Sequence, residues 1–397
     1  MTSSTILVLN CGSSSIKFAV IDALTQSVHI NGLVERLNAS GTVLRWTIQD
    51  TRQHLDLPHA SYETAMDAII KLLHDAGLFN NIIAVGHRVV HGGEQFKQST
   101  LINDTVLQNI EKCVHLAPLH NPSNYLGIKL MQQHFHDKPQ AAVFDTSFHQ
   151  TMPSHAYHYA IPEYFYTQHG VRRYGFHGIS YRYVMQHTLE LLNLPENNHA
   201  LIIAHLGNGC SACAILNGAS QDTTMGMTPL EGLIMGTRAG DIDPGIIGYI
   251  ASELNLTLDQ IIEILNKKSG LLGISDLSMD MRTLEQQAAQ NHAGAKLAID
   301  MFCYRLAKNI AALSTALPHV DALIFTGGIG ENSSLVRQKT IERLRQFNLI
   351  IDAALNIEHG KKSKGIITTP ESKIAMVVPT NEELLIAQDT YQLLNIK

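Results

Sequence analysis

The stretch that decides the fold is Leu7-Val8-Leu9-Asn10-Cys11-Gly12-Ser13-Ser14-Ser15-Ile16-Lys17. It predicts a strand at Ile6–Leu9, a turn of small residues at Asn10–Ser15 and a second strand at Ile16–Ile21. Small turn residues let backbone N–H groups approach an anion closely, and the serine hydroxyls add donors. The hairpin is therefore either an anion-binding loop or a solvated turn. The other glycine turns of the chain bear on this choice.

Strand patterns alternate with helix patterns along the chain, which predicts an α/β architecture. Strands are expected at Ile82–Val85, Ala141–Phe144, Leu201–Ala204 and Ala322–Phe325, and helices from Ser61 to Gly77 and over 179–193, 257–268, 292–316, 333–347 and 381–394. The stretch Leu201–Leu216 repeats the pattern of strand, Gly/Ser/Asn turn and strand seen in Ile6–Val20. This repeat indicates either a duplicated domain or two β-hairpins that merely look alike.

Composition excludes several classes of protein. A chain of 397 residues suggests two or three domains, and its net charge of −6 argues against nucleic-acid binding. No apolar run reaches the roughly 18 residues that span a bilayer, and the first basic residue is Lys17, so neither a membrane span nor a signal peptide is expected. The cysteines are too few for a disulfide framework, which fits a cytoplasmic protein. The pair Cys210 and Cys213 is interpreted as core packing, because no second pair follows at zinc-site spacing.

Two further glycine turns each follow an apolar strand. They are Gly207-Asn208-Gly209 and Gly327-Gly328-Ile329-Gly330-Glu331-Asn332, and the second opens a helix whose free N–H groups favour a phosphate. There is no GxxxxGK[ST] motif and no GxGxxG after the first strand, so neither a P-loop enzyme nor a Rossmann dehydrogenase is expected. Three glycine turns at strand ends together predict a nucleotide cleft.

Four side chains are candidates for chemistry. Arg88 and Arg238 are flanked by glycines and could reach a carboxylate or phosphoryl group bidentately, or form structural salt bridges. Asp145 follows an apolar strand, where an acid can hold a metal shell, orient an arginine, move a proton or simply cap a turn. His177 lies between Gly175 and Gly178, which permit close approach to a substrate.

Long motifs that run in order from residue 7 to residue 391 resemble those of the acetate kinases, the acetokinase family. Besides residues 7–17, they are Gly86-His87-Arg88-Val89-Val90-His91-Gly92-Gly93, Ala117-Pro118-Leu119-His120-Asn121-Pro122, Phe144-Asp145-Thr146-Ser147-Phe148-His149-Gln150-Thr151-Met152-Pro153, Tyr174-Gly175-Phe176-His177-Gly178, His205-Leu206-Gly207-Asn208-Gly209, Met227-Thr228-Pro229-Leu230-Glu231-Gly232-Leu233, Gly236-Thr237-Arg238, Gly327-Gly328-Ile329-Gly330-Glu331-Asn332 and Pro379-Thr380-Asn381-Glu382-Glu383.

The resemblance implies the fold shared by acetate and sugar kinases, heat-shock chaperone ATPases and actin. That fold has two duplicated ribonuclease-H-like domains flanking an ATP cleft. Domain I is expected at 1–150 plus 384–397, with the N-terminal phosphate loop and part of the acyl site, and domain II, which binds the nucleotide, at 151–383. A homodimer is expected, since homodimers are usual in the family.

The resemblance also assigns roles to individual residues. It gives Asp145, His177 and Arg238 catalytic roles, with Arg88 at the substrate carboxylate and Val90, Leu119, Phe176 and Pro229 around the acyl methyl group. It places ATP at Lys17, His205, Leu206, Gly207, Asn208, Gly209, Asp280, Met281, Arg282, Gly328, Ile329, Gly330, Glu331 and Asn332. It assigns Mg²⁺, for which Mn²⁺ may substitute, to Asn10 and Glu382, partly through water. Met281 departs from the family, which often has phenylalanine there.

The expected activity is reversible, Mg²⁺-dependent phosphoryl transfer between ATP and acetate, giving acetyl phosphate and ADP. Asp145 is the family's proposed acid/base, but we expect it to orient an arginine or hold Mg²⁺ through water, because an ordinary carboxylic acid is already ionised at pH 7. The alternatives are propionate or butyrate as substrate, or a non-metabolic ATPase that switches partners as chaperones and actin do. Propionate-preferring relatives have a smaller alanine where this chain has Val90, which favours acetate.

Overall fold

The computed structural model describes residues 4–394, which form two compact units. Unit 1 takes the chain up to Phe148 and again from Asn381, and unit 2 takes His149–Thr380. The sequence placed the domain crossings near 150 and 384, and the function assigned to each domain stays a prediction at this point.

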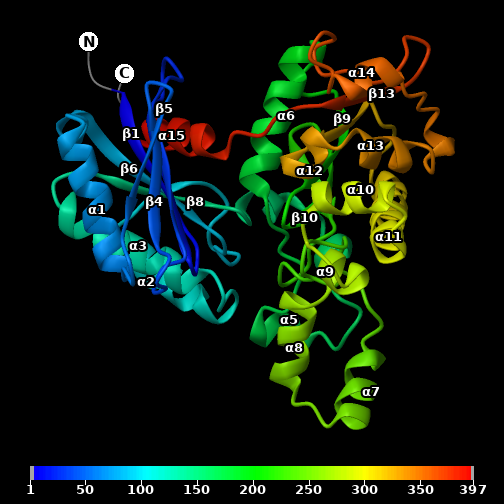
Figure 1. The fold of residues 1–397 in the computed structure, drawn as a ribbon, viewed down its shortest axis with the longest axis horizontal. Coiled ribbons are helices and arrows are strands. Elements are labelled where there is room, and N and C mark those ends of the chain that lie inside the picture. Colours follow the sequence, from blue (N-terminus) through cyan, green and yellow to red (C-terminus); the bar gives the residue numbers. More distant parts are fainter. Residues whose placement is uncertain (1–3, 395–397) are drawn as a thin grey trace. The chain divides into compact units, whose positions relative to one another are not determined.

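Unit 1 contains an eight-stranded sheet in the order β5-β4-β3-β2-β1-β6-β8-β7 (Figure 1). The strands are β1 Thr5–Cys11, β2 Ser15–Asp22, β3 Val28–Glu35, β4 Val43–Ile48, β5 Thr51–Asp56, β6 Ile82–Val89, β7 Thr100–Leu101 and β8 Gln140–Phe144. The helices are α1 Tyr62–Asp75, α2 Asp104–Lys112, α3 Asn121–His134 and α15 Glu382–Leu393, with short 3-10 turns at Phe79–Asn81 and Cys113–His115. A further 3-10 turn, Ser147–Thr151, spans the crossing into unit 2.

Unit 2 contains a five-stranded sheet in the order β11-β10-β9-β12-β13. The strands are β9 Ala200–Leu206, β10 Cys210–Leu216, β11 Ala219–Thr223, β12 Ala322–Thr326 and β13 Ile374–Val377. The helices are α4 Ser154–Tyr157, α5 Tyr164–His169, α6 Gly178–Leu192, α7 Gly245–Leu254, α8 Leu258–Lys267, α9 Gly270–Ser275, α10 Met281–Ala289, α11 Ala293–Leu313, α12 Gly327–Asn332, α13 Ser334–Ile341 and α14 Ala353–Ile357, with 3-10 turns at Ser314–Ala316 and Arg345–Phe347.

The two sheets share one topology. In unit 1, β1 pairs antiparallel with β2 and parallel with β6, which pairs parallel with β8. In unit 2, β9 pairs antiparallel with β10 and parallel with β12, which pairs parallel with β13. The repeated order supports the duplicated-domain interpretation of the two hairpins over a chance likeness.

Both faces of the central strands of unit 1 are covered by helices. One face packs its alternating apolar residues against α1 and the end of α3, and these residues form one buried cluster. Helix α15 packs against the strands β1, β6 and β8 (Figure 1). A Cβ atom on Gly86 would lie 2.4 Å from Thr390 Oγ1, so this glycine lets α15 approach β6 closely. The C-terminal helix, and the residue that begins it, are thereby fixed against the sheet.

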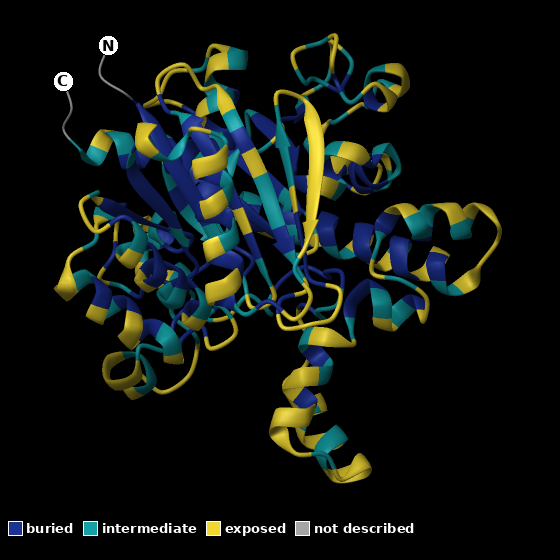
Figure 2. Ribbon diagram, turned by 60° about the vertical axis from the view of Figure 1, so that its left-hand side comes forward, coloured by how far each residue is buried: buried dark blue, intermediate teal, exposed yellow. Residues whose placement is uncertain are grey.

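Most expected elements are present, and several bounds differ. Helix α1 begins after Ser61, whose side chain accepts a hydrogen bond from the Thr64 N–H, as the sequence predicted. The single helix predicted over 333–347 is wrong: α13 ends at Ile341, and a separate 3-10 turn follows. The outer strand β5 was not predicted, because it is exposed along its whole length and carries no apolar alternation (Figure 2).

Cys210 and Cys213 are fully buried, in agreement with the core-packing prediction. Within residues 4–394, no helix combines the length and the apolar character needed to cross a membrane.

Candidate active site

Three predicted residues of unit 1 lie at the carboxyl ends of neighbouring strands. Asn10 is near the end of β1, Arg88 near the end of β6, and Asp145 directly follows β8. Because β1, β6 and β8 are adjacent and parallel, these ends meet at one edge of the sheet, where open α/β sheets bind ligands. Across the first hairpin, Asn10 pairs with Lys17.

Arg88 and Asp145 form a two-point ion pair. Arg88 donates from Nε to Asp145 Oδ1 at 3.0 Å and from Nη2 to Oδ2 at 2.6 Å, and Asp145 is only 1% exposed. Burial by itself would lower the pKa of the Arg88 guanidinium, but the nearby carboxyl groups of Asp145 and Glu382 raise it above its ordinary value. Both oxygens of Asp145 are thus engaged in fixing a permanently charged arginine.

Glu382 begins α15 and is half-buried, with its Oε1 atom fully buried and without a hydrogen-bond partner in the described structure. Burial raises the pKa of its carboxyl group to about 7; Arg88 acts against this rise, and Asp145 adds to it. An orphaned buried oxygen of this kind fits a cation or an ordered water. No group of three or more His, Cys, Asp or Glu residues within 4–394 could hold a metal alone. The oxygen donors of Asn10 and Glu382 therefore fit a Mg²⁺ ion that keeps most of its waters.

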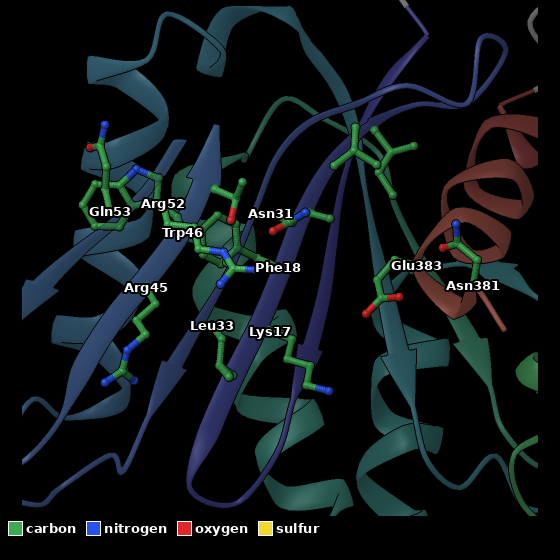
Figure 3. A pocket seen from close by; sticks show the side chains of 15 residues that line it. Lys17, Phe18, Asn31, Leu33, Arg45, Trp46, Arg52, Gln53, Asn381 and Glu383 are labelled. Atoms are coloured by element: carbon green, nitrogen blue, oxygen red, sulfur yellow. The ribbon is translucent and has the colours of Figure 1, made fainter. Parts of the chain in front are cut away.

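A cavity of about 580 Å³ in unit 1 is lined by β2–β5 and the start of α15 (Figure 3). Lys17 and Glu383 both line it, and Lys17 is exposed. The other two cations at this cavity are Arg45, which pairs with Glu35, and Arg52. Lys17 thus belongs to unit 1, whereas the other residues that the sequence assigned to ATP belong to unit 2.

The predicted acyl-pocket residues are divided between the units. In unit 1, Val90 is 8% exposed and its N–H donates to Asn124 Oδ1 at 2.9 Å, whereas Leu119 is 53% exposed. In unit 2, Phe176 is 2% exposed, and Pro229 is half-buried.

In unit 2, His177 directly precedes α6 with a left-handed backbone, φ 59°. Its Nδ1 atom is 2.8 Å from Ser211 Oγ, and its ring stacks on the His205 ring with 4.2 Å between centroids. The sequence did not identify Ser211 as a site residue. The hairpin pattern could have indicated it, because the register of the β9–β10 hairpin puts Ser211 directly opposite His205.

Arg238 converges with His177 on the Gly207-Asn208-Gly209 turn. A Cβ atom on Gly209 would lie 3.2 Å from Arg238 Nη2 and 3.3 Å from His177 Nε2. Arg238 Nη1 donates to the Pro229 carbonyl at 2.6 Å, and among the described residues no carboxylate pairs with this guanidinium. Burial lowers the pKa of Arg238, which nonetheless remains a cation at neutral pH. The arrangement leaves a positive charge available to an anion.

A second cavity, of about 560 Å³, lies in unit 2 beside the glycine turns. Its lining contains the predicted ATP residues Gly207, Asn208, Asp280, Met281, Arg282, Gly328, Ile329 and Asn332, and also Met279, Glu285 and Ser333, which the sequence missed. His205, Leu206, Gly209, Gly330 and Glu331 do not line it. The cavity is thus built from three segments of one unit, two of which are the glycine turns.

Glu331 has a different environment from the one expected for an ATP ligand. Its Oε1 atom accepts hydrogen bonds from the backbone N–H of Gly327 at 2.9 Å and of Thr380 at 3.2 Å. The Glu331 carboxylate thus bonds to the backbone of the strand-to-helix turn that contains it. Ser333, by contrast, caps α13 and contacts Glu285 at the cavity wall.

Comparison with known proteins gives one consistent result. The family model described as the acetokinase family matches residues 5–388. A protein named acetate kinase 1 from Neisseria meningitidis serogroup A is 51% identical over 395 residues, covering 99% of both chains, and an acetate kinase from Stutzerimonas stutzeri is 49% identical over 100% of both. Among solved structures, a propionate kinase from Francisella tularensis is similar with a TM-score of 0.94 and 44% identity, over 98% of this chain and 99% of that one. The Porphyromonas gingivalis acetate kinase follows at 0.92 and 41%, with the same coverage.

Proposed function

This chain belongs to the acetokinase family, and we propose that it transfers the γ-phosphoryl group of ATP to acetate, giving acetyl phosphate and ADP reversibly. In such a transfer the transition state spreads charge over the equatorial phosphoryl oxygens, so cations and positioning supply most of the catalysis. The observation that carries the proposal is Arg238, a guanidinium without a carboxylate partner that shares the space above Gly209 with His177. These two groups would stabilise the transferring phosphoryl group.

Arg88 would bind the carboxylate of acetate. Its guanidinium is held from one side by both oxygens of Asp145, which fixes its plane before substrate arrives. A carboxylate acceptor carries no proton at neutral pH, so the transfer requires no general base. Asp145 is therefore proposed as the residue that orients Arg88, and not as a base.

Asn10 and Glu382 are proposed to hold a hydrated Mg²⁺, with Mn²⁺ as a substitute. When bound, the ion would neutralise charge on the phosphate oxygens of ATP. The protein's own contribution would be the buried, otherwise unpartnered oxygen of Glu382 and the half-buried carboxamide of Asn10.

The nucleotide is proposed to bind in the 560 Å³ cavity of unit 2, with its phosphates toward the glycine turns. Backbone N–H groups in such turns suit phosphate oxygens. This proposal assigns nucleotide binding mainly to the second domain, and the metal residues and part of the acyl site to the first, as the sequence predicted.

The function is tested by incubating the protein with ATP, Mg²⁺, acetate and hydroxylamine. Acetyl hydroxamate is expected, because hydroxylamine traps an acyl phosphate as it forms. ADP formation that needs no acetate and gives no hydroxamate would instead indicate a simple ATPase.

Propionate is the second candidate substrate, because one of the most similar solved structures is named a propionate kinase. Val90 favours acetate, since its two methyl groups fill space that a third substrate carbon would need. One methylene changes discrimination by about 1–3 kcal/mol, so acetate should be preferred roughly 10–200-fold in kcat/KM.

A homodimer is proposed on the apolar surface of α7. No residue of this helix is buried, and Ile246, Tyr249 and Leu254 are 40%, 69% and 64% exposed. Contiguous exposed apolar surface of this kind marks a contact with another chain. Sedimentation of the purified protein at twice the monomer mass would support the dimer. The proposed location is the cytoplasm, which supplies ATP and suits the five free cysteines.

A further inference from the structure

Two loops of unit 2 meet at an ion pair that the mechanism above does not use. Arg173 donates from Nη2 to Glu231 Oε1 at 2.7 Å, and the two side chains are 19% and 33% exposed. Tyr159 donates its hydroxyl to the second carboxylate oxygen of Glu231. We call these three side chains, Tyr159, Arg173 and Glu231, the loop clamp.

The clamp holds the backbone of the segment 223–232. Arg173 Nη1 donates to successive carbonyl groups of this segment, at 2.9, 3.0 and 3.2 Å, those of Thr223, Thr224 and Met225. The Tyr159 hydroxyl oxygen accepts from the N–H of Met227 at 2.9 Å. Two members of the clamp therefore bind the same short segment through its main chain, and the third, Glu231, belongs to that segment.

Gly226 lies at the centre of this arrangement. A Cβ atom there would be 1.7 Å from Glu231 Oε2, so any other residue would displace the carboxylate. The Gly226 carbonyl accepts from the N–H groups of Tyr174 at 3.1 Å and Gly175 at 3.2 Å. These two residues lead into Phe176 and His177, so the segment 223–232 is attached to the loop that carries His177.

The same segment also holds Arg238. Pro229 is two residues before Glu231, and its carbonyl accepts from Arg238 Nη1 at 2.6 Å. Arg238 has no carboxylate partner, so this carbonyl is its one side-chain hydrogen bond within the described residues. A shift of the segment would therefore carry the guanidinium with it.

We propose that the loop clamp is a positioning device for phosphoryl transfer, which holds Arg238 through the Pro229 carbonyl and His177 through Gly226. The inference rests on the proposed function. Tyr159, Arg173 and Glu231 touch no reacting atom in it, and they act only through the segment that they bind.

The charge state of the clamp suits a fixed support. Burial alone would lower the pKa of Arg173, but Glu231, Tyr159 and Asp222 together outweigh burial and raise it. Burial and the Glu231 carboxylate also raise the pKa of Tyr159 above its ordinary value. Near neutral pH Arg173 therefore stays a cation and Tyr159 stays a neutral hydroxyl donor.

The test compares Glu231→Gln and Tyr159→Phe, which keep side-chain volume, in the wild-type background and in an Arg238→Ala background. In the wild-type background kcat for acetyl hydroxamate formation should fall between about 10-fold and 10²-fold, since small misplacements of catalytic groups cost this much. KM for ATP should stay within about twofold, because no clamp residue lines the nucleotide cavity. In the Arg238→Ala background the same substitutions should lower kcat less, because one of the two groups that they position is gone.

The matched control is Asp300→Asn, which removes the ion pair between Lys339 and Asp300; this pair is also in unit 2 and is 2.8 Å long, against 2.7 Å for Arg173 and Glu231. This variant should keep normal kcat in both backgrounds. Equal losses for Glu231→Gln in the two backgrounds, or unchanged kcat, would overturn the inference and leave the clamp a stabilising ion pair.

A structural readout separates this inference from the proposed function. In a crystal structure of Glu231→Gln, the distance from the Pro229 carbonyl to Arg238 Nη1 should grow beyond hydrogen-bonding range, about 3.5 Å. An unchanged contact would refute the clamp even if the enzyme uses acetate. A wild-type protein that forms no acyl phosphate would refute the proposed function, and the structural comparison would still decide whether the clamp holds Arg238.

Discussion

Gly209→Ala should lower kcat by adding a single methyl group. The new Cβ would lie 3.2 Å from Arg238 Nη2 and 3.3 Å from His177 Nε2, which is closer than relaxed carbon–nitrogen contacts. Neither neighbour can move away freely, because Arg238 is bonded to the Pro229 carbonyl and His177 to Ser211. To relieve these close contacts, Arg238 and His177 therefore have to shift by a few tenths of an ångström.

A misplacement of about 1 Å costs roughly 10²-fold in rate, so a shift of a few tenths should lower kcat about tenfold, or ~1.4 kcal/mol in the activation barrier. KM for ATP should change little, because Gly209 does not line the nucleotide cavity. The measurements are initial rates of hydroxamate formation at varied ATP and acetate, together with a thermal melt of each protein.

Gly41→Ala is the matched control. Its Cβ would lie 3.3 Å from another guanidinium nitrogen, Arg36 Nη1, but at an exposed position outside the proposed site. It should keep full activity and a normal melting temperature. If Gly209→Ala were as active as Gly41→Ala, His177 and Arg238 would not need the positions seen here, and the reasoning that joins them at the phosphoryl group would be refuted.

Three more substitutions test separate parts of the mechanism. Arg238→Ala should lower kcat by at least about 10²-fold with little change in ATP binding, as for other groups that stabilise transition-state charge, and near-normal turnover would remove Arg238 from the mechanism. Asp145→Asn should lower kcat without changing the shape of the pH–rate profile; loss of an acidic limb present in the wild type would show that Asp145 is a base. Val90→Ala should narrow or invert the preference for acetate in kcat/KM, mainly by improving propionate, and a wild type that already favours propionate would contradict the acetate assignment.

The sequence predicted the architecture because the fold depends on features that are local in the chain. The apolar runs at Ile6–Leu9 and Leu201–Ala204, each followed by a turn of small residues, are both buried strands of antiparallel hairpins. The strand β5 escaped prediction because all of its residues are exposed, so nothing in its composition distinguishes it from a loop. Its position depends on pairing with β4, which is a property of the sheet and not of the segment.

The sequence proposed the candidate site residue by residue but gave few of the contacts that the structure shows. The sequence led us to expect that Asp145 orients an arginine or holds Mg²⁺, but only the structure shows that both of its oxygens accept from Arg88. Sequence likewise gave no indication that the Glu331 carboxylate binds the backbone of its own turn, and its assignment to ATP stays a prediction. A charged residue in a conspicuous motif can act on the ligand or on the loop that meets the ligand, and sequence alone does not separate the two.

This distinction also gives a physical reason for two glycines near the candidate site. Gly226 leaves room for the Glu231 carboxylate, and Gly209 leaves room for Arg238 and His177. In both cases the glycine is required by a side chain that approaches from elsewhere in the chain, and its φ lies outside the left-handed range. A glycine of this kind marks a place where charged groups converge, so alanine there should disturb the rate before it disturbs the fold, as proposed for position 209.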